Sequence, residues 1–372
     1  MMVLYENQHI PKELSEHIKN DKTLHNYFEI NFNGIRPKNY CGFLKVDGKE
    51  HFIMPKISNK DDTNLNIFIY MLMYVYDINF HHEETANFQD IKHRMFEIFI
   101  RYFSDTFLKE LKRGVFRKYI TLEERLKVLK GKYIYGKNFT DFYHQNIYCQ
   151  YDEFSIDNEL NRFFVYAIKI FKKYSTYRNL AYLESIFEEV SFSYIDISRL
   201  DLKFDKTNKR YLHSFDIALI LLKKLIPLPS KAAQKNFIFL FDMGEIFEKF
   251  IGKLYKEIDN STKLQCQKNF GSLQLKPDIL TQDMIIDTKY KKISRKDDLS
   301  AQDKYQMFVY GKNFKIKDTM LLYPKHLQNV KEDLKLGEGE NMVNLKMRSI
   351  DLESDKKFDE YVDEIKMRLE EI

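Results

Sequence analysis

Three residues in the C-terminal third of the chain have the types and the spacing that phosphodiester hydrolysis requires. Asp278 opens one short apolar segment, and Asp287 and Lys289 follow the next one, 284–286. Alternate residues of a strand point the same way, so Asp287 and Lys289 share a face, and a hairpin can bring Asp278 beside them. Two carboxylates can hold Mg²⁺, which activates water, while a lysine stabilises charge on phosphorus. The pattern indicates metal-dependent cleavage.

The same residues also have a simpler interpretation. An Asp-x-Lys pair in a strand is common and is usually a surface salt bridge worth less than about 1 kcal/mol. Pro277 before Asp278, and the apolar strand that ends at Asp287, favour the catalytic interpretation. The elements that must position these side chains therefore carry the argument further.

A helix is expected upstream of the hairpin. Apolar residues recur at helical spacing within 237–251 and predict an amphipathic helix there: Met243, Ile246, Phe247, Phe250 and Ile251. Glu245 and Glu248 are three positions apart and share an edge of this helix. Either one could provide a third carboxylate, or both could be solvated helix charges.

A second helix is expected downstream, over 301–310, with Ser300 as its N-cap. Gln306 and Tyr310 lie one turn apart on it, where both could hydrogen-bond a phosphate or a base edge, or be the polar tips of a half-buried helix. Apolar strands follow at 319–323 and 344–347. The order helix, strand, strand, helix, strand predicts an α/β unit with a mixed sheet.

Taken together, these residues resemble the PD-(D/E)xK nuclease superfamily and, more narrowly, the McrC family, the nuclease subunits of McrBC modification-dependent restriction systems. The similarity extends in order from about residue 40 to 324. The segments that carry it are Tyr40-Cys41-Gly42, Ile53-Met54-Pro55-Lys56-Ile57, the first helix at 66–72, Asp152-Glu153-Phe154 with Asn161-Arg162, Leu240-Phe241-Asp242-Met243 with Phe247-Glu248, and Tyr323-Pro324. Gly244 departs from the family, whose members often carry Asn there, and this could alter the start of the helix.

The resemblance implies a set of roles. Asp278 and Asp287 would bind Mg²⁺, with Mn²⁺ as an alternative ion, and Lys289 would complete the catalytic centre. Glu248 is preferred over Glu245 as a supporting residue, because it follows Phe247 in the family's Phe-Glu pair. Gln306 would position phosphate or base without binding the ion.

DNA contacts are expected from the residues beside this centre. Lys291 and Lys292 belong to a basic run that continues to Lys296, and Tyr310 lies on the following helix. The basic run could equally be a solvated loop. The net charge of +5 permits contact with nucleic acid but does not by itself argue for it.

A partner is expected because the chain contains no G-x-x-x-x-G-K-[ST] motif and no other phosphate-cradling glycine loop. It therefore binds no nucleotide itself. The resemblance implies a separate hexameric McrB-like AAA+ GTPase or ATPase, which reads the modified base. In that family the N-terminal region of McrC docks at the hexamer pore and stimulates hydrolysis.

Composition and length place few further limits. Three distant cysteines give neither a disulfide framework nor a CxxC metal site, which fits a reducing cytoplasm. The apolar run 65–75 is too short to span a bilayer and predicts a buried helix. No signal peptide is visible. A cytoplasmic protein without membrane contact is expected.

We expect a mixed α/β fold in three parts. Residues 1–150 would form a β-rich and helical partner-docking domain with a hairpin at Asp47-Gly48, and 151–230 a helical linking region. Residues 231–372 would form the PD-(D/E)xK endonuclease domain, after a break at 227–230. A short strand is expected at 133–135 and an amphipathic helix near the C-terminus.

Two other functions remain open from the sequence. The chain could be a stand-alone nuclease of the same fold, acting in DNA repair, or a non-catalytic adaptor that activates an AAA+ partner. The N-terminal similarities argue against the first. The intact Asp278, Asp287 and Lys289 argue against the second.

Overall fold

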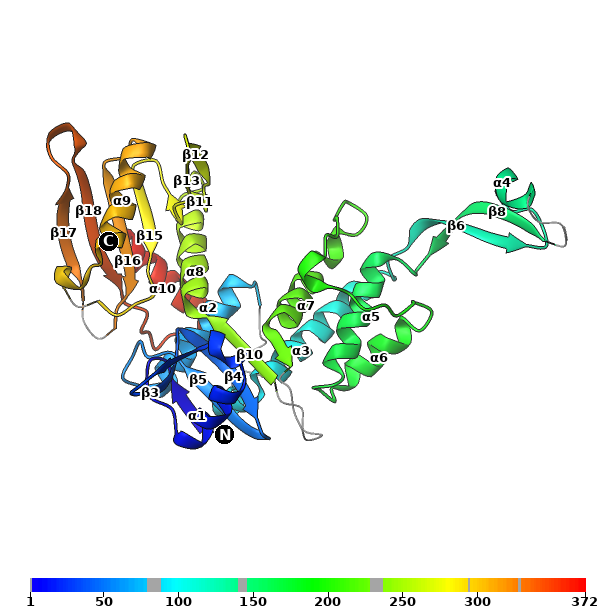
Figure 1. Cartoon of the computed structure of the whole chain (residues 1–372), viewed down its shortest axis with the longest axis horizontal. Helices are drawn as coiled ribbons and strands as arrows, with labels where there is room; N and C mark the ends of the chain where they lie inside the picture. Colours follow the sequence, from blue (N-terminus) through cyan, green and yellow to red (C-terminus); the bar gives the residue numbers. More distant parts are fainter. Residues whose placement is uncertain (1, 79–87, 140–145, 228–236, 294, 327–328) are drawn as a thin grey trace. The chain divides into compact units, whose positions relative to one another are not determined.

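The computed structural model describes residues 2–78, 88–139, 146–227, 237–293, 295–326 and 329–372 (Figure 1). The chain forms two compact units, one from Met1–His93 with Pro227–Ile372 and the other from Arg94–Ile226. These borders differ from the expected ones at 150 and 230. The expected break at 227–230 lies mostly outside the described residues. The mixed α/β class is confirmed.

The first unit has two main sheets. Its elements are β1 (Met2–Tyr5), α1 (Lys12–Asn20), β2 (Phe28–Asn31), β3 (Gly34–Pro37), β4 (Tyr40–Val46), β5 (Lys49–Met54), α2 (Asp61–Val75), β10 (Phe237–Asp242), α8 (Met243–Ile258), β11 (Lys263–Leu264), β12 (Lys268–Phe270), β13 (Leu273–Leu275), β14 (Ile279–Leu280), β15 (Met284–Thr288), α9 (Ala301–Phe314), β16 (Asp318–Pro324), β17 (Lys331–Leu336), β18 (Val343–Ile350) and α10 (Phe358–Glu370).

The N-terminal sheet explains why the two ends of the chain form one unit. Its neighbouring strands run β1-β5-β4-β10, so a strand from residue 237 onward completes a sheet begun by the first 54 residues. Strands β4 and β5 form the expected hairpin, in which Asp47 and Gly48 take the positive φ angles that this tight turn requires. Helix α2 packs on β5 and α8, so the expected buried helix at 65–75 is confirmed.

The C-terminal sheet has the strand order β11-β14-β15-β16-β18-β17. Strands β15, β16 and β18 are parallel, while β14 and β17 run antiparallel to their neighbours. Helix α9 packs on β15, β16 and β18, and α8 packs on β15 and against α10 (Figure 1). The expected strands at 319–323 and 344–347 and the C-terminal helix are confirmed.

The second unit is mostly helical and carries a long hairpin. Its elements are β6 (Lys118–Leu126), β7 (Lys132–Tyr133), α4 (Tyr135–Phe139), β8 (Ile147–Ser155), α5 (Glu159–Phe171), α6 (Arg178–Ile186) and α7 (Leu212–Lys224), while α3 (Phe88–Leu111) and β9 (Leu225–Pro227) cross the unit border. Short 3₁₀ turns occur in both units. Those of the second unit are Ile197–Arg199 and Lys209–Tyr211, and those of the first are Leu24–Asn26, Lys296–Asp298 and Gly339–Asn341. Stacked aromatic rings fill the helical core, and the ring centroids of Phe107 and Phe164 are 3.9 Å apart.

Two local expectations need correction. The expected strand at 133–135 ends at Tyr133, and Tyr135 begins α4. Within 237–251, helix begins only at Met243, because 237–242 forms β10 and Asp242 caps α8 by accepting hydrogen bonds from the Gly244 and Glu245 amides. Gly244 therefore leaves the start of the helix intact.

Candidate active site

The candidate site lies where β14 and β15 pair. Ile279 faces Ile286, and continuing this antiparallel register places Asp278 opposite Asp287. Directly opposed residues on one face of an antiparallel pair have neighbouring side chains. The hairpin thus brings together the two carboxylates that the sequence separates by nine positions. We call Glu248, Asp278, Asp287, Lys289 and Gln306 the catalytic cluster, after the roles that the sequence predicts for them.

Asp287 is the most buried member of the cluster, with 2 % of its surface exposed. Its Oδ1 accepts a hydrogen bond from Gln306 Nε2 at 3.3 Å. Its Oδ2 lies 2.6 Å from Lys289 Nζ and has no other partner among the described residues. Burial, followed by the negative charge of Asp278, raises the pKa of Asp287 to about 6. The positive charge of Lys289 therefore stabilises this buried carboxylate.

Lys289 is held as an ammonium. Its Nζ also donates to Gln306 Oε1 at 3.2 Å. Burial alone would lower the pKa of Lys289, but the charges of Asp287, Asp278 and Asp303 outweigh burial, so the pKa is raised. A lysine that stays protonated can stabilise negative charge but cannot act as a general base.

Asp278 is oriented by the strand opposite. Its Oδ2 accepts two hydrogen bonds from Thr288, one from the amide at 2.8 Å and one from Oγ1 at 3.0 Å. These bonds fix one carboxylate oxygen. Thr288 was not singled out from the sequence, because only the hairpin register reveals its place beside Asp278.

Glu245 and Glu248, both on α8, have different surroundings. Glu248 faces the cluster: burial, then the charges of Asp278 and Asp287, raise its pKa to about 7, and it accepts a hydrogen bond from Gln265 Nε2. Glu245 pairs instead with Lys249, 2.6 Å away and one helical turn on. No local signal points to Gln265, because it lies on a separate loop.

Helix α9 supplies the far wall of the site. The structure confirms Ser300 as its N-cap. Gln306 contacts Asp287 and Lys289, and its Nε2 lies 3.1 Å from the Tyr310 hydroxyl, which donates to the Lys276 carbonyl at 3.1 Å. Tyr310 is only 7 % exposed, so its place suits orienting Gln306 better than touching DNA.

The expected basic contacts also differ from one another. Lys292 is exposed, whereas Lys291 is half-buried and forms an ion pair with Asp303. Burial opposes ionisation of Asp303, but the hydrogen bonds from Lys291 and Ser300 and the charges of Lys291 and Lys289 together outweigh it, so the pKa of Asp303 is lowered. Asp303 was missed in the sequence, although its place three residues after Ser300 is the signature of a capping residue.

The residues fit a hard divalent cation by their chemistry. Within the described ranges, no three His, Cys, Asp or Glu side chains converge closely enough to form a metal site by themselves. Nevertheless, Asp278 and Asp287 have carboxylate oxygens of the kind that such a cation prefers, and the pKa values of Asp287 and Glu248 are raised first by burial and then by the charges of neighbouring carboxylates. A cation held by Asp278 and Asp287 would relieve this repulsion.

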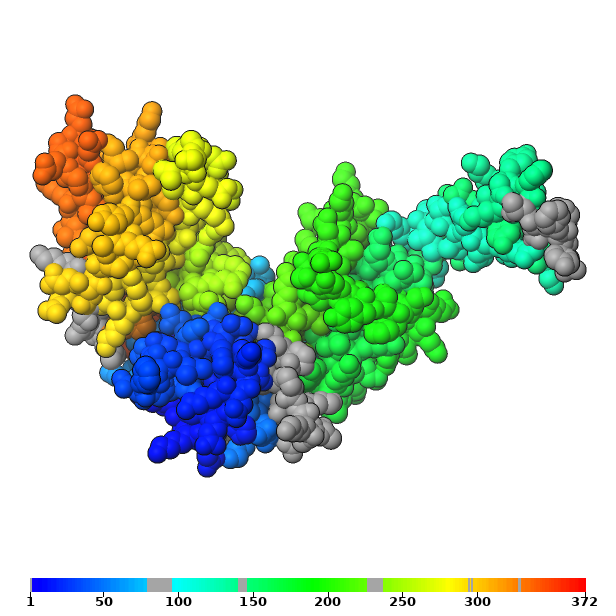
Figure 2. All heavy atoms as spheres, viewed as in Figure 1, coloured from blue at the N-terminus to red at the C-terminus, as the bar shows by residue number. Residues whose placement is uncertain are grey.

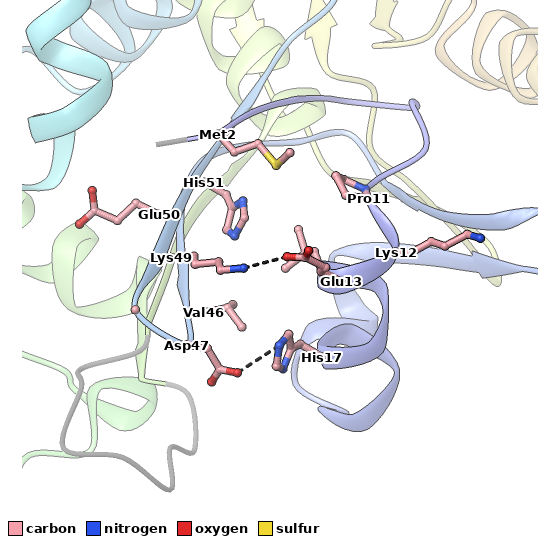
Figure 3. Close-up of a pocket in the computed structure, with 12 residues that line it drawn as sticks. Met2, Pro11, Lys12, Glu13, His17, Val46, Asp47, Lys49, Glu50 and His51 are labelled. Carbon is pink, nitrogen blue, oxygen red and sulfur yellow. Dashed lines mark hydrogen bonds and ion pairs between the residues drawn. The ribbon is translucent and has the colours of Figure 1, made fainter.

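A separate cavity of about 940 Å³ lies between α1 and the β4–β5 hairpin (Figure 3). Two ion pairs cross it, His17 to Asp47 at 3.1 Å and Lys49 to Glu13 at 2.8 Å. None of the catalytic cluster lines it. The cavity therefore does not contribute to the candidate active site.

The sequence predictions for disulfides and membrane spans concern the cysteines and the helices. Cys41, Cys149 and Cys266 are all free thiols. In the part of the chain that the structure describes, each helix falls short of the length and apolarity that crossing a membrane requires.

Comparison with known proteins identifies relatives of the whole chain. The family model described as McrBC 5-methylcytosine restriction system component matches residues 35–324. A chain in the refined half-complex of Thermococcus gammatolerans McrB AAA+ hexamers with bound McrC matches with a TM-score of 0.61 at 19 % identity, covering 100 % of this chain and 99 % of that one.

A chain in the cryo-EM structure of the Thermococcus gammatolerans McrBC complex matches with a TM-score of 0.49 at 22 % identity, covering 70 % of this chain and 87 % of that one. No curated protein matches. The first of these two structures shares the fold of this chain over its full length.

Proposed function

This chain belongs to the McrBC 5-methylcytosine restriction system component family, as its motifs predicted, and from that premise we propose that it is the DNA-cleaving subunit of a nucleotide-dependent restriction complex. The observation that carries the proposal is the convergence of Asp278, Asp287 and Lys289 at the end of two paired strands. The partner would be a McrB-like AAA+ hexamer, as in the Thermococcus gammatolerans assembly. A cytoplasmic location belongs to the same proposal.

Each member of the cluster has a role in this proposal. Asp278 and Asp287 would hold Mg²⁺, or Mn²⁺, which when bound polarises the phosphate and lowers the pKa of water. Lys289, kept protonated by its acidic neighbours, stabilises the charge that develops on the phosphate oxygens. Gln306 fixes the relative orientation of Asp287 and Lys289 through one amide group.

Glu248 has a supporting role. It lies close enough to Asp278 and Asp287 for their charges to raise its pKa, but it does not complete a three-carboxylate group. Its pKa of about 7 lets it hold or release a proton at neutral pH. Lys292, exposed beside the site, is the better candidate of the two lysines for contact with the DNA backbone.

Docking on the AAA+ ring is the second part of the proposal. The expected docking region, 1–150, contains most of the β6–β8 hairpin, 118–155, which is drawn in cyan to green in Figure 2. Several aromatic side chains between these ends are exposed. Phe139 is 89 % exposed and Tyr135 81 % exposed. Exposed apolar groups gathered on one element mark protein interfaces. We therefore locate the ring contact on this hairpin.

The catalytic assignment is tested by substitution. We expect Asp278→Ala, Asp287→Ala and Lys289→Ala each to lower the rate of cleavage of 5-methylcytosine-containing DNA by about two to three orders of magnitude, because each removes a ligand or a charge from the reacting centre. Asp283→Ala is the matched control, because Asp283 is an exposed carboxylate of the same hairpin. Cleavage is measured with Mg²⁺, the AAA+ subunit and GTP or ATP.

The outcomes separate the alternatives. Undiminished cleavage by all three variants would show that the catalytic cluster has no part in DNA cleavage. Cleavage by the wild-type chain with no AAA+ subunit present would favour a stand-alone nuclease. Stimulation of nucleotide hydrolysis without any DNA cleavage would favour an adaptor.

A further inference from the structure

A carboxylate near the N-terminus is buried and bonded to Tyr290, the residue that follows Lys289. Glu6, directly after β1, is only 3 % exposed. Its Oε1 accepts hydrogen bonds from the Tyr290 hydroxyl at 2.7 Å and from the Lys56 amide at 2.8 Å. Its Oε2 lies 4.0 Å from Cys41 Sγ. A buried acid costs free energy unless it is hydrogen-bonded, so its place here needs an explanation.

Tyr290 follows Lys289 in the chain. Two residues that flank strands of the N-terminal sheet, Glu6 and Asn39, form hydrogen bonds with it. Its hydroxyl binds Glu6, and its carbonyl oxygen accepts a hydrogen bond from Asn39 Nδ2 at 3.1 Å. Its ring is buried and lies 5.7 Å from the ring of His326. The segment after β15 is thus attached to residues that are about 250 and 284 positions away in the chain.

Lys289 lies just beyond the end of a strand and has few backbone hydrogen bonds of its own. Strand β15 ends at Thr288, and beyond it Lys289 keeps a single sheet-like bond, from its amide to the Leu322 carbonyl at 2.9 Å. The chain then turns, with the Lys291 amide donating to the Lys289 carbonyl at 3.0 Å. The next residue, Tyr290, is buried and hydrogen-bonded through both its hydroxyl and its carbonyl, so it restrains the backbone directly after Lys289.

We propose that Glu6 is a positioning residue for the nuclease site, acting through Tyr290 to hold Lys289 against Asp287 and Gln306. This inference rests on the proposed nuclease function and extends it. The N-terminal sheet is then a part of the support of the active site. A displacement of about 1 Å in a catalytic group can lower a rate by about 10²-fold, so a remote hydrogen bond can matter.

Protonation of Glu6 does not change the acceptor that Tyr290 uses. Burial raises the pKa of Glu6 to about 7, against the opposing bonds from Lys56 and Tyr290. Both the acid and the carboxylate have an oxygen that can accept from the hydroxyl. A glutamine at this position would keep that oxygen, whereas an alanine would leave Tyr290 without its partner.

The test compares four variants of the full chain. We expect Glu6→Ala and Tyr290→Phe to lower kcat for DNA cleavage about ten- to a hundredfold, while KM for DNA and Mn²⁺ affinity, followed by electron paramagnetic resonance, stay within about twofold. Glu6→Gln should restore most of the kcat that Glu6→Ala loses. Tyr361→Phe is the control, because it removes a buried hydroxyl that has no hydrogen-bond partner in the described structure.

Three results would overturn the inference. The first is a kcat for Glu6→Ala and Tyr290→Phe equal to that of Tyr361→Phe. The second is a parallel loss of kcat, Mn²⁺ affinity and thermal stability, which indicates general damage to the fold. The third is failure of Glu6→Gln to exceed Glu6→Ala. If the wild-type chain cleaves DNA no faster than Asp287→Ala does, the proposed nuclease function is rejected, and this inference with it.

Discussion

At the scale of single residues, the catalytic cluster concentrates negative charge that the folded chain neutralises only in part. Asp287 and Glu248 have pKa values of about 6 and about 7, raised first by burial and then by neighbouring carboxylates. Lys289 offsets part of this charge. A raised pKa means that the folded chain holds these protons more tightly than the unfolded chain does.

The sign of the pH dependence follows. For the metal-free protein, the contribution of Glu248 and Asp287 to the free energy of unfolding is fully present below their ordinary pKa values of 4.5 and 3.8 and is lost as pH rises toward 7, because the unfolded chain releases these protons first. A cation that replaces these protons must bind more tightly as pH rises. Its affinity should increase from below pH 6 to about 7 and then level off.

Substitution of Glu248, with Glu245 as its control, tests this dependence. We expect Glu248→Gln to shift the pH midpoint of Mg²⁺ binding and cleavage downward, toward the pKa of Asp287 near 6, while keeping most of the activity at neutral pH. Below the midpoint, affinity should fall about tenfold per pH unit for each displaced proton. Glu245→Gln is the control, because Glu245 pairs with Lys249. A larger shift from Glu245→Gln would reverse the assignment.

At the scale of elements, the β6–β8 hairpin stands out by its exposure. Its nine-residue strands pair from Lys118↔Ser155 to Leu126↔Ile147, and most of the side chains of β6 are exposed. Only Cys149 and Tyr151 of its two strands are buried, so this hairpin contributes little to a core. Its exposed aromatic residues are better explained by a partner than by the fold.

Removal of this hairpin is the corresponding prediction. Because Lys118 and Ser155 face each other, an Asn-Gly turn can replace residues 119–154 without changing the ends of α3 and α5. We expect this variant to stimulate nucleotide hydrolysis by the AAA+ subunit about fivefold less or worse. Asp287→Ala should stimulate it fully, because its change lies in the other compact unit.

Single substitutions refine the same test. Phe139→Asp should weaken stimulation, whereas Tyr182→Asp should not, although Tyr182 is also 60 % exposed and belongs to the same unit. Full stimulation by the hairpin-deleted chain would move the contact to another surface, such as the helical part of this unit or the first unit.

At the scale of the whole molecule, the first unit is built from both ends of the chain. Strand β10 begins the C-terminal part but pairs with β4 along its whole length, from Phe237↔Lys45 to Asp242↔Tyr40. Five of its six residues are buried. A nuclease domain cut from the chain at residue 231 would therefore expose a strand that the N-terminal sheet now covers.

We expect residues 231–372 expressed alone not to fold stably. Exposing the five apolar residues of β10 at about 2 kcal/mol each would cost roughly 10 kcal/mol, as much as the whole stability of an ordinary domain. Circular dichroism and thermal melting would show this as a missing or strongly lowered transition. The hairpin-deleted chain is the control and should melt within a few degrees of wild type. A cooperative transition of the isolated fragment near the wild-type temperature would contradict the prediction.

Local signals in the sequence determined much of the active-site frame. The apolar periodicity of α8, the Ser300 cap of α9 and the Asp47-Gly48 turn depend on neighbouring residues alone, so they could be read without the fold. The expected hairpin between Asp278 and Asp287 is present for the same reason. Even here, 237–242 was not separated from the helix, because an apolar run before a helix has no period of its own.

Only the tertiary structure decided which distant residues meet. The pairing of β10 with β4, the bond from Tyr290 to Glu6 and the ion pair of Lys291 with Asp303 join side chains that no sequence spacing relates. The burial of Tyr310, which places it behind Gln306, also depends on packing. Local patterns fix periodicity and turns, whereas register, burial and charge environment arise from contacts between segments far apart in the chain.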